Sequence, residues 1–141
     1  MSTETDAFLA EVLDKQRAAE QAIHQGNFEP RMALWSQMDP VTLFGAQLSG
    51  SGWDEIEPVF RQVASWFTES VESEFEVVAA GASGDLAYTV GYERNRVTVK
   101  GVPRTYTLRV THVYRREEGQ WRIVHRHADF PPDPDAPLFP R

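Results

Sequence analysis

Two different periods of apolar residues divide the chain into a helical first half and a stranded second half. Apolar positions recur at helical spacing over residues 8–23, and Gly26 stands where a C-terminal cap is expected. A shorter helix with Pro30 in its first turn is predicted to stop at Asp39-Pro40, because a residue before proline avoids helical dihedrals. The β-rich run over residues 41–45 predicts a short strand.

A third helix and four long strands complete the pattern. Residues 50–52 predict a loop, and Asp54 with Glu57 has the spacing of a capping box for a helix that ends near Ser70. From Val71 onward the apolar period changes to two, which predicts strands over residues 73–81, 85–99, 104–116 and 120–130. Their short, turn-like connections predict that neighbouring strands are antiparallel.

This order of elements predicts the fold class and the domain organisation. Helix, helix, short strand, helix and four long strands indicate an α+β domain, in which a curved antiparallel sheet wraps around three N-terminal helices and encloses a pocket. We expect one domain over residues 1–130, which is a usual size for a single core. The proline-rich tail over residues 131–141 is not expected to join the sheet.

Composition and charge exclude several classes of function. A formal net charge of −7 disfavours nucleic acid and anionic membranes as partners, because both require a basic surface. The chain has no apolar run long enough to span a bilayer, and its acidic N-terminus lacks the features of a signal peptide, so we expect a cytoplasmic protein. Without cysteine there are no disulfides or thiolate metal sites, and we expect no cofactor.

Three polar residues alternate along the last predicted strand: His125, His127 and Asp129. Alternate residues on a strand share a face, so a metal site is one interpretation. A metal site would require ligands from later segments, which the sequence does not supply, and we therefore expect no metal. A second interpretation is acid–base chemistry by His127 with Asp129, or by His112 with either of them. A third is that these residues line an interface.

The two faces of the last strand both contain apolar residues, which predicts that the sheet is buried on both sides. Trp121 and Ile123 share the parity of the histidines, whereas Val124 and Ala128 share that of Arg126. Burial on both sides indicates a homodimer that pairs through the sheet. Either the odd-numbered or the even-numbered face could line the pocket, and a β-bulge would shift the register. The sequence leaves these alternatives open.

Several segments together resemble the NTF2-like superfamily. They are "LWSQMDPVTLFGA", "GWDEIEPVF", "GDLAYTVGYER" and "LRVTHVYRREEGQWRIVHRHAD", within a resemblance that covers residues 8–129. The superfamily includes SnoaL-like polyketide cyclases, ketosteroid isomerases and the calcium/calmodulin-dependent kinase association domains. More narrowly, the chain resembles an uncharacterised bacterial subgroup described as SnoaL-like or ketosteroid isomerase-like. The resemblance implies a cone-like α+β fold with an apolar pocket, most often in a homodimer.

The catalytic residues of the ketosteroid isomerases do not carry over. No tyrosine precedes Tyr88, and the position of the general base falls at about Phe44 or Gly45. The kinase association domains match better, with a pocket-facing arginine at the position of His112 and another that resembles Arg94. The expected polar groups of the pocket are therefore His112, Arg94, Tyr92 and Tyr114, and the expected aromatic groups are Trp53, Trp66, Phe44 and Phe60.

Two functional hypotheses follow from these features. In the first, the protein binds a small, mostly apolar organic molecule and acts as a cofactor-free isomerase, cyclase or hydrolase. Its acid–base groups would be His112, Arg94 and Tyr92, with Asp129 or His127. In the second, the chain is a non-catalytic ligand-binding or dimeric assembly module. Two ionisable groups within hydrogen-bonding reach inside a closed cavity would favour the enzyme.

Overall fold

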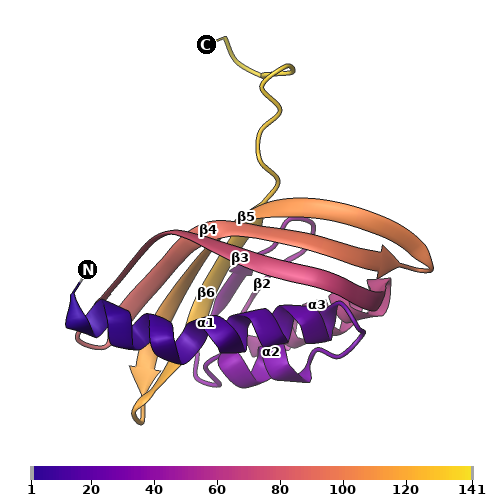
Figure 1. Cartoon of the computed structure of the whole chain (residues 1–141). Helices are drawn as coiled ribbons and strands as arrows, with labels where there is room; N and C mark the ends of the chain where they lie inside the picture. Colours follow the sequence, from indigo (N-terminus) through magenta and orange to yellow (C-terminus); the bar gives the residue numbers. More distant parts are fainter. Residues whose placement is uncertain (1, 141) are drawn as a thin grey trace.

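The structure, a computed structural model, describes residues 2–140 as three helices and six strands (Figure 1). The helices are α1 (Thr3–Ile23), α2 (Glu29–Leu34) and α3 (Trp53–Trp66). The strands are β1 (Thr42–Phe44), β2 (Ser49–Ser51), β3 (Phe67–Ser83), β4 (Leu86–Val99), β5 (Val102–Glu117) and β6 (Gln120–Asp129). No helix in the described part of the chain is long and apolar enough to span a membrane.

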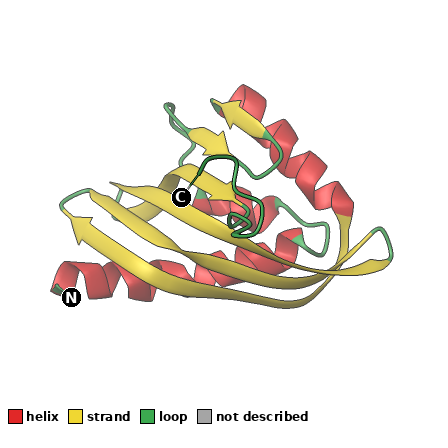
Figure 2. Cartoon of the chain, turned by 90° about the horizontal axis from the view of Figure 1, so that it is seen from above, coloured by secondary structure: helices red, strands yellow, loops and turns green. Residues whose placement is uncertain are grey.

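One curved, unclosed sheet arches over the helices, in the order β2-β1-β6-β5-β4-β3 (Figures 1 and 2). The long strands pair antiparallel with their neighbours, as predicted. The short β1 differs, because it runs parallel to β6 while forming an antiparallel pair with β2. The predicted α+β class and the wrapping of the sheet around three helices are confirmed. The concave side that faces the helices is called the inner face below, and the opposite side the outer face.

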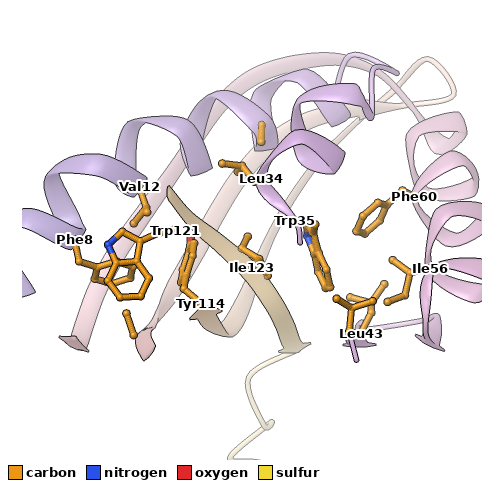
Figure 3. Close-up of a cluster of buried hydrophobic side chains, with 13 residues drawn as sticks. Phe8, Val12, Leu34, Trp35, Leu43, Ile56, Phe60, Tyr114, Trp121 and Ile123 are labelled. Carbon is orange, nitrogen blue, oxygen red and sulfur yellow. The ribbon is translucent and has the colours of Figure 1, made fainter. Parts of the chain in front are cut away.

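The inner face is packed solid where α1 crosses it (Figure 3). α1 begins after Ser2, whose hydroxyl accepts a hydrogen bond from the backbone N–H of Thr5. The Phe8 ring then packs edge-on against Tyr114 and Trp121, with ring centroids 5.0 and 5.3 Å apart. This end of the inner face is therefore core, held by aromatic burial.

The local structure around α3 differs from the prediction at both ends. No side chain caps α3, which begins after Gly52, and the Glu55 carboxylate accepts a hydrogen bond from the Ser51 N–H at 2.8 Å. The predicted Asp54/Glu57 capping box is therefore wrong. The helix ends at Trp66 and β3 starts at once, because Phe67 already has extended dihedrals. Part of the predicted loop at residues 50–52 is strand β2, paired with β1.

A β-bulge in β6 decides which way the last strand faces. His125 pairs with Val113 and Ile123 with Tyr114, so Val124 is an extra residue between two register positions. As a result, Ile123 and Arg126 are both buried on the inner face although their parity differs. Past the bulge, His125, His127 and Asp129 lie on the outer face. Their position in the sequence alone had not shown whether they face the pocket or the outside. Beyond β6 the tail is exposed and contributes no helix or strand over residues 131–140 (Figure 1).

Candidate functional site

The inner face is open where α1 ends, and the opening is a cavity of about 560 Å³. It is surrounded by the C-terminal end of α1, by helix α3 and by the β1–β2 loop. The C-terminal end of β4 and the N-terminal half of β5 complete its wall. Much of the wall is apolar, with Ile23, Leu43, Leu48, Val59, Phe60, Val63, Trp66, Phe67 and Leu108. Its size and its lining are typical of a site for a small organic molecule.

A cluster of polar side chains, buried except for the partly buried Tyr106, forms the inner end of this cavity. It consists of Glu20, His24, Arg31, Tyr106 and Arg126, contributed by α1, α2, β5 and β6. Arg31 donates a hydrogen bond to Glu20, and the Arg126 guanidinium lies 3.6 Å from the same carboxylate. The Tyr106 hydroxyl lies 2.6 Å from His24 Nε2. The cavity therefore combines an apolar body with concentrated hydrogen-bonding groups at one end.

His24 and Tyr106 are poised as a neutral acid–base pair. Burial lowers the pKa of His24 below 6.5, although the Glu20 carboxylate opposes that shift, so the ring is neutral near pH 7. Burial, followed by the field of Glu20, raises the pKa of Tyr106, so the phenol keeps its proton. His24 Nδ1 lies 3.2 Å from the Ser73 hydroxyl, which orients the ring. When Nδ1–H donates to Ser73, Nε2 accepts a hydrogen bond from the Tyr106 hydroxyl.

Arg126, one member of this cluster, also forms a buried ion pair with Glu93 on β4. Arg126 donates two hydrogen bonds to Glu93, at 2.8 and 2.9 Å. Burial alone would raise the pKa of Glu93, but the charge and hydrogen bonds of Arg126 lower it to about 2. Arg126 thus reaches the cavity with its charge already compensated, and Glu93 fixes the orientation of its guanidinium.

The same arginine also contacts His112, a second buried histidine. Arg126 Nη1 donates to His112 Nε2 at 3.2 Å, and the Gln16 amide lies 3.0 Å from Nδ1. Burial, reinforced by the Arg126 charge, lowers the pKa of His112 to about 3, so the imidazole is neutral. The two ring nitrogens of this neutral imidazole are thus approached by Arg126 and by the Gln16 amide nitrogen, which also donates to the Tyr114 hydroxyl.

The structure places some of the predicted site residues on the inner face. Phe60 and Trp66 line the cavity. His112 and Tyr114 are buried on the inner face, but they lie beneath α1 and do not line the cavity. Trp53 packs against Trp35 in the core and donates its indole N–H to the Ser36 carbonyl at 2.7 Å.

The other predicted residues lie on the outer face, so the expected grouping of Tyr92 and Arg94 with His112 is wrong. β4 pairs Glu93 with Leu108 and Tyr92 with Arg109, and directly paired residues share a face. Glu93 and Leu108 are buried on the inner face, which leaves Tyr92 and Arg94 outside. Arg94 pairs there with Glu76.

Phe44, His127 and Asp129 are outside as well. The Phe44 ring stands edge-on to His125 and His127, with ring centroids 5.5 and 5.7 Å away. Asp129 accepts two hydrogen bonds from Arg109, each 2.7 Å long. His125 bonds Thr42 at 2.7 Å. Among residues 2–140, no group of three or more histidine, aspartate or glutamate side chains is placed to hold a metal ion.

Sequence reasoning missed the polar cluster, although α1 contains a signal for it. Phe8 and Val12 begin a stripe of buried residues at intervals of four, and the stripe continues as Gln16, Glu20 and His24. Polar side chains on a face that buries apolar ones point to a polar site inside the fold. On β5, Tyr106 continues the inward-facing series of Leu108 and Val110 in the same way.

Solved structures share this fold at low sequence identity. A proposed calcium/calmodulin-dependent protein kinase type II association domain from Thiobacillus denitrificans is 20% identical, with a TM-score of 0.72, covering 86% of this chain and 96% of that one. A proposed dehydratase of the NTF2-like family from Streptomyces avermitilis is 18% identical, with a TM-score of 0.71 and coverage of 89% and 97%. An NTF2-like protein of unknown function from Pseudomonas putida is 23% identical, with a TM-score of 0.72 and coverage of 94% and 92%.

Comparison with families of known sequence is consistent with these structures. No curated protein matches the chain. The model of the SnoaL-like domain family matches residues 12–133, which include the α1 stripe from Val12 onward, the cavity and all of β3 to β6. The chain therefore belongs to the SnoaL-like domain family, with an NTF2-like fold.

Proposed function

We propose that this protein binds a small, mainly apolar organic molecule in the cavity and moves a proton on it with His24 and Tyr106. The observation that supports this most directly is the placement of a neutral imidazole and a protonated phenol, 2.6 Å apart, at the buried end of an apolar cavity. Such a ligand would direct a carbonyl or hydroxyl group toward the cluster and leave its apolar part against α3.

The proposed chemistry is proton transfer next to a carbonyl group. Tyr106 donates its hydrogen bond to the ligand's carbonyl oxygen, where negative charge develops as the adjacent C–H bond breaks. His24 Nε2 takes the proton from that carbon and later returns it to the same or another carbon atom. Isomerisation, cyclisation and dehydration all contain such a step. The solved structure from Streptomyces avermitilis, described as a proposed dehydratase, has the same fold.

A neutral fluorescent dye tests binding in the cavity. We expect 1-aminoanthracene to gain fluorescence with the wild-type protein. Val63→Trp fills the cavity from α3 and should weaken dye binding at least ten-fold, whereas Gln62→Trp, next to it on the exposed side of the helix, should not. Equal binding by both variants would place the dye elsewhere and contradict the proposal.

A simple ketone tests the chemistry without knowledge of the natural substrate. In D₂O, we expect the wild-type protein to accelerate deuterium exchange at the carbon atoms next to the carbonyl of 2-tetralone, followed by NMR. His24→Gln and Tyr106→Phe should each slow the catalysed exchange by about 100-fold, since a positioned acid or base typically contributes at least that much. His127→Gln, on the outer face, is the matched control. If exchange with the wild-type protein is no faster than in buffer, the proposed proton transfer is contradicted and only the proposed binding remains.

The outer face favours a second candidate function, assembly of identical chains. Phe44 is 51% exposed and Tyr88 is 43% exposed on this face, and the helices of the described residues lie on the opposite side of the sheet (Figure 1). Phe44 lies beside His125 and His127, and exposed aromatic residues of this kind are typical of an interface. We propose that two copies pair through it. Sedimentation velocity of the wild-type chain should give the mass of a dimer, and a monomer at micromolar concentration would contradict this.

A further inference from the structure

The charges that line the cavity are balanced at its inner end and unbalanced at its mouth. At the inner end, Arg31 and Arg126 are compensated by Glu20 and by Glu93 behind it. At the mouth, Lys100 and Arg104 line the cavity and are exposed. Apart from Glu20, no carboxylate of residues 2–140 lines the cavity, so nothing in its wall compensates these two cations.

Arg104 is unusual among the arginines of this chain. The other arginines within residues 17–126 have a carboxylate, carbonyl, amide or aromatic ring as a partner. The Arg104 guanidinium, alone among those of the described residues, has no such contact. A free guanidinium stands out in a chain of net charge −7, where carboxylates are abundant.

The backbone holds both cations toward the cavity. Arg104 pairs with Val97, which is buried on the inner face, so Arg104 projects from the same face of the sheet. Lys100 lies in the turn between β4 and β5, where its backbone N–H donates to the Trp66 carbonyl at 3.2 Å. This hydrogen bond ties the turn to the end of α3, so that both side chains border the mouth.

We propose that the ligand is an amphipathic organic acid, whose carboxylate is held at the mouth by Arg104 and Lys100. Its apolar part fills the cavity and a neutral polar group reaches Tyr106. Arg104 and Tyr106 are two residues apart on one strand face, which is about 7 Å along the strand. The inner end would not accept the carboxylate, because its cations are already paired with buried carboxylates. This proposal rests on the proposed binding function.

Displacement of 1-aminoanthracene by octanoate and by 1-octanol tests the proposal, because the two molecules differ in the charged group. In Lys100→Gln/Arg104→Gln, octanoate should bind about 3- to 10-fold more weakly than to the wild-type protein, while 1-octanol changes less than two-fold. This fold-change is what the loss of two exposed ion pairs, one for each cation, would produce. The octanoate difference should shrink in 0.5 M NaCl, because salt screens exposed charges.

The matched control is Arg94→Gln/Arg96→Gln, which removes two positive charges from β4 on the outer face. It should leave both affinities within two-fold of the wild type. Unchanged octanoate binding in the mouth variant, or an equal effect of the control, would overturn the inference while dye and octanol still bind. If the wild-type protein binds neither dye nor octanol, the proposed binding function fails and this inference fails with it.

Discussion

Strands β4, β5 and β6 carry an arginine–carboxylate pair on each face of the sheet, and each pair is joined by two hydrogen bonds in a different environment. On the inner face, Arg126 and Glu93 make two hydrogen bonds and their side chains are 6% and 4% exposed. On the outer face, Arg109 and Asp129 also make two, but their side chains are 47% and 44% exposed. In the inner pair, Glu93 fixes the orientation of the Arg126 guanidinium at the cavity, whereas the outer pair is exposed to water. Burial, more than the pair itself, decides what each can do.

The largest expected effect comes from breaking the buried pair on one side. Arg126→Met leaves the Glu93 carboxylate buried without its partner, and the free energy of unfolding should fall by about 3–5 kcal/mol. Urea denaturation followed by tryptophan fluorescence measures the loss. Removing the other charge as well, in Glu93→Leu/Arg126→Met, should recover at least half of it. A single variant as stable as the wild type would contradict the buried-pair interpretation.

Acid should destabilise the inner face through His112. Its pKa of about 3 in the folded chain lies below the 6.5 of the unfolded chain, so between these values only the unfolded chain binds the proton. Stability is therefore present above pH 6.5 and is lost as pH falls. From pH 6.5 to 5, His112 should contribute a loss of about 1.5 kcal/mol in the free energy of unfolding. Urea denaturation of His112→Gln should show a correspondingly shallower loss, and an equal slope would contradict this.

A charge on the apolar part of the outer face should act on assembly and not on folding. Phe44→Glu places a carboxylate in the proposed two-fold pairing, where both copies would bury it, and should raise the dissociation constant of the dimer at least ten-fold. Sedimentation velocity measures the change. Val102→Glu, also at an exposed apolar position but on the β4–β5 hairpin, is the control. Equal effects of both would exclude this face as the interface.

The smallest expected effect is loss of the outer pair. Hydrogen bonds from Arg109 hold the pKa of Asp129 below its usual value, but both side chains are nearly half exposed. Asp129→Asn should therefore lower the free energy of unfolding by less than about 1 kcal/mol. The decrease should be smaller still in high salt, which screens exposed charges. Thermal or urea unfolding compares it with Arg126→Met. A loss as large as that of the buried pair would show that exposure does not separate the two faces.

Much of the fold could be predicted because its signals are local. The long helix at residues 3–23 and the strands from residue 73 onward follow from the period of their own apolar residues. The exact start of α3 was missed because its N-terminal cap is Gly52, which has no side chain to cap the helix. β2 was missed because three small polar residues carry no apolar period, and only pairing with β1 makes them a strand.

The candidate site could be predicted only in part. Phe60 and Trp66 line the cavity, since α3 covers this end of the sheet, and their role in ligand binding stays a prediction. Tyr92 and Arg94 were assigned to the wrong face. Alternation shows which residues of one strand share a face, but not which residues of the neighbouring strand lie on that same face. His24 and Tyr106 are separated by more than 80 positions in the sequence, and their hydrogen bond exists only in the folded chain.

The segment over residues 121–130 shows where the division lies. Its amino acids determine a strand that is apolar on both faces, because that depends on side-chain chemistry and period alone. The tertiary structure decides that Val124 bulges, that Arg126 turns inward to Glu93, and that His125, His127 and Asp129 face outward. The reason is physical: pairing with β5 and β1 sets the register, and a shift of one residue exchanges the two faces.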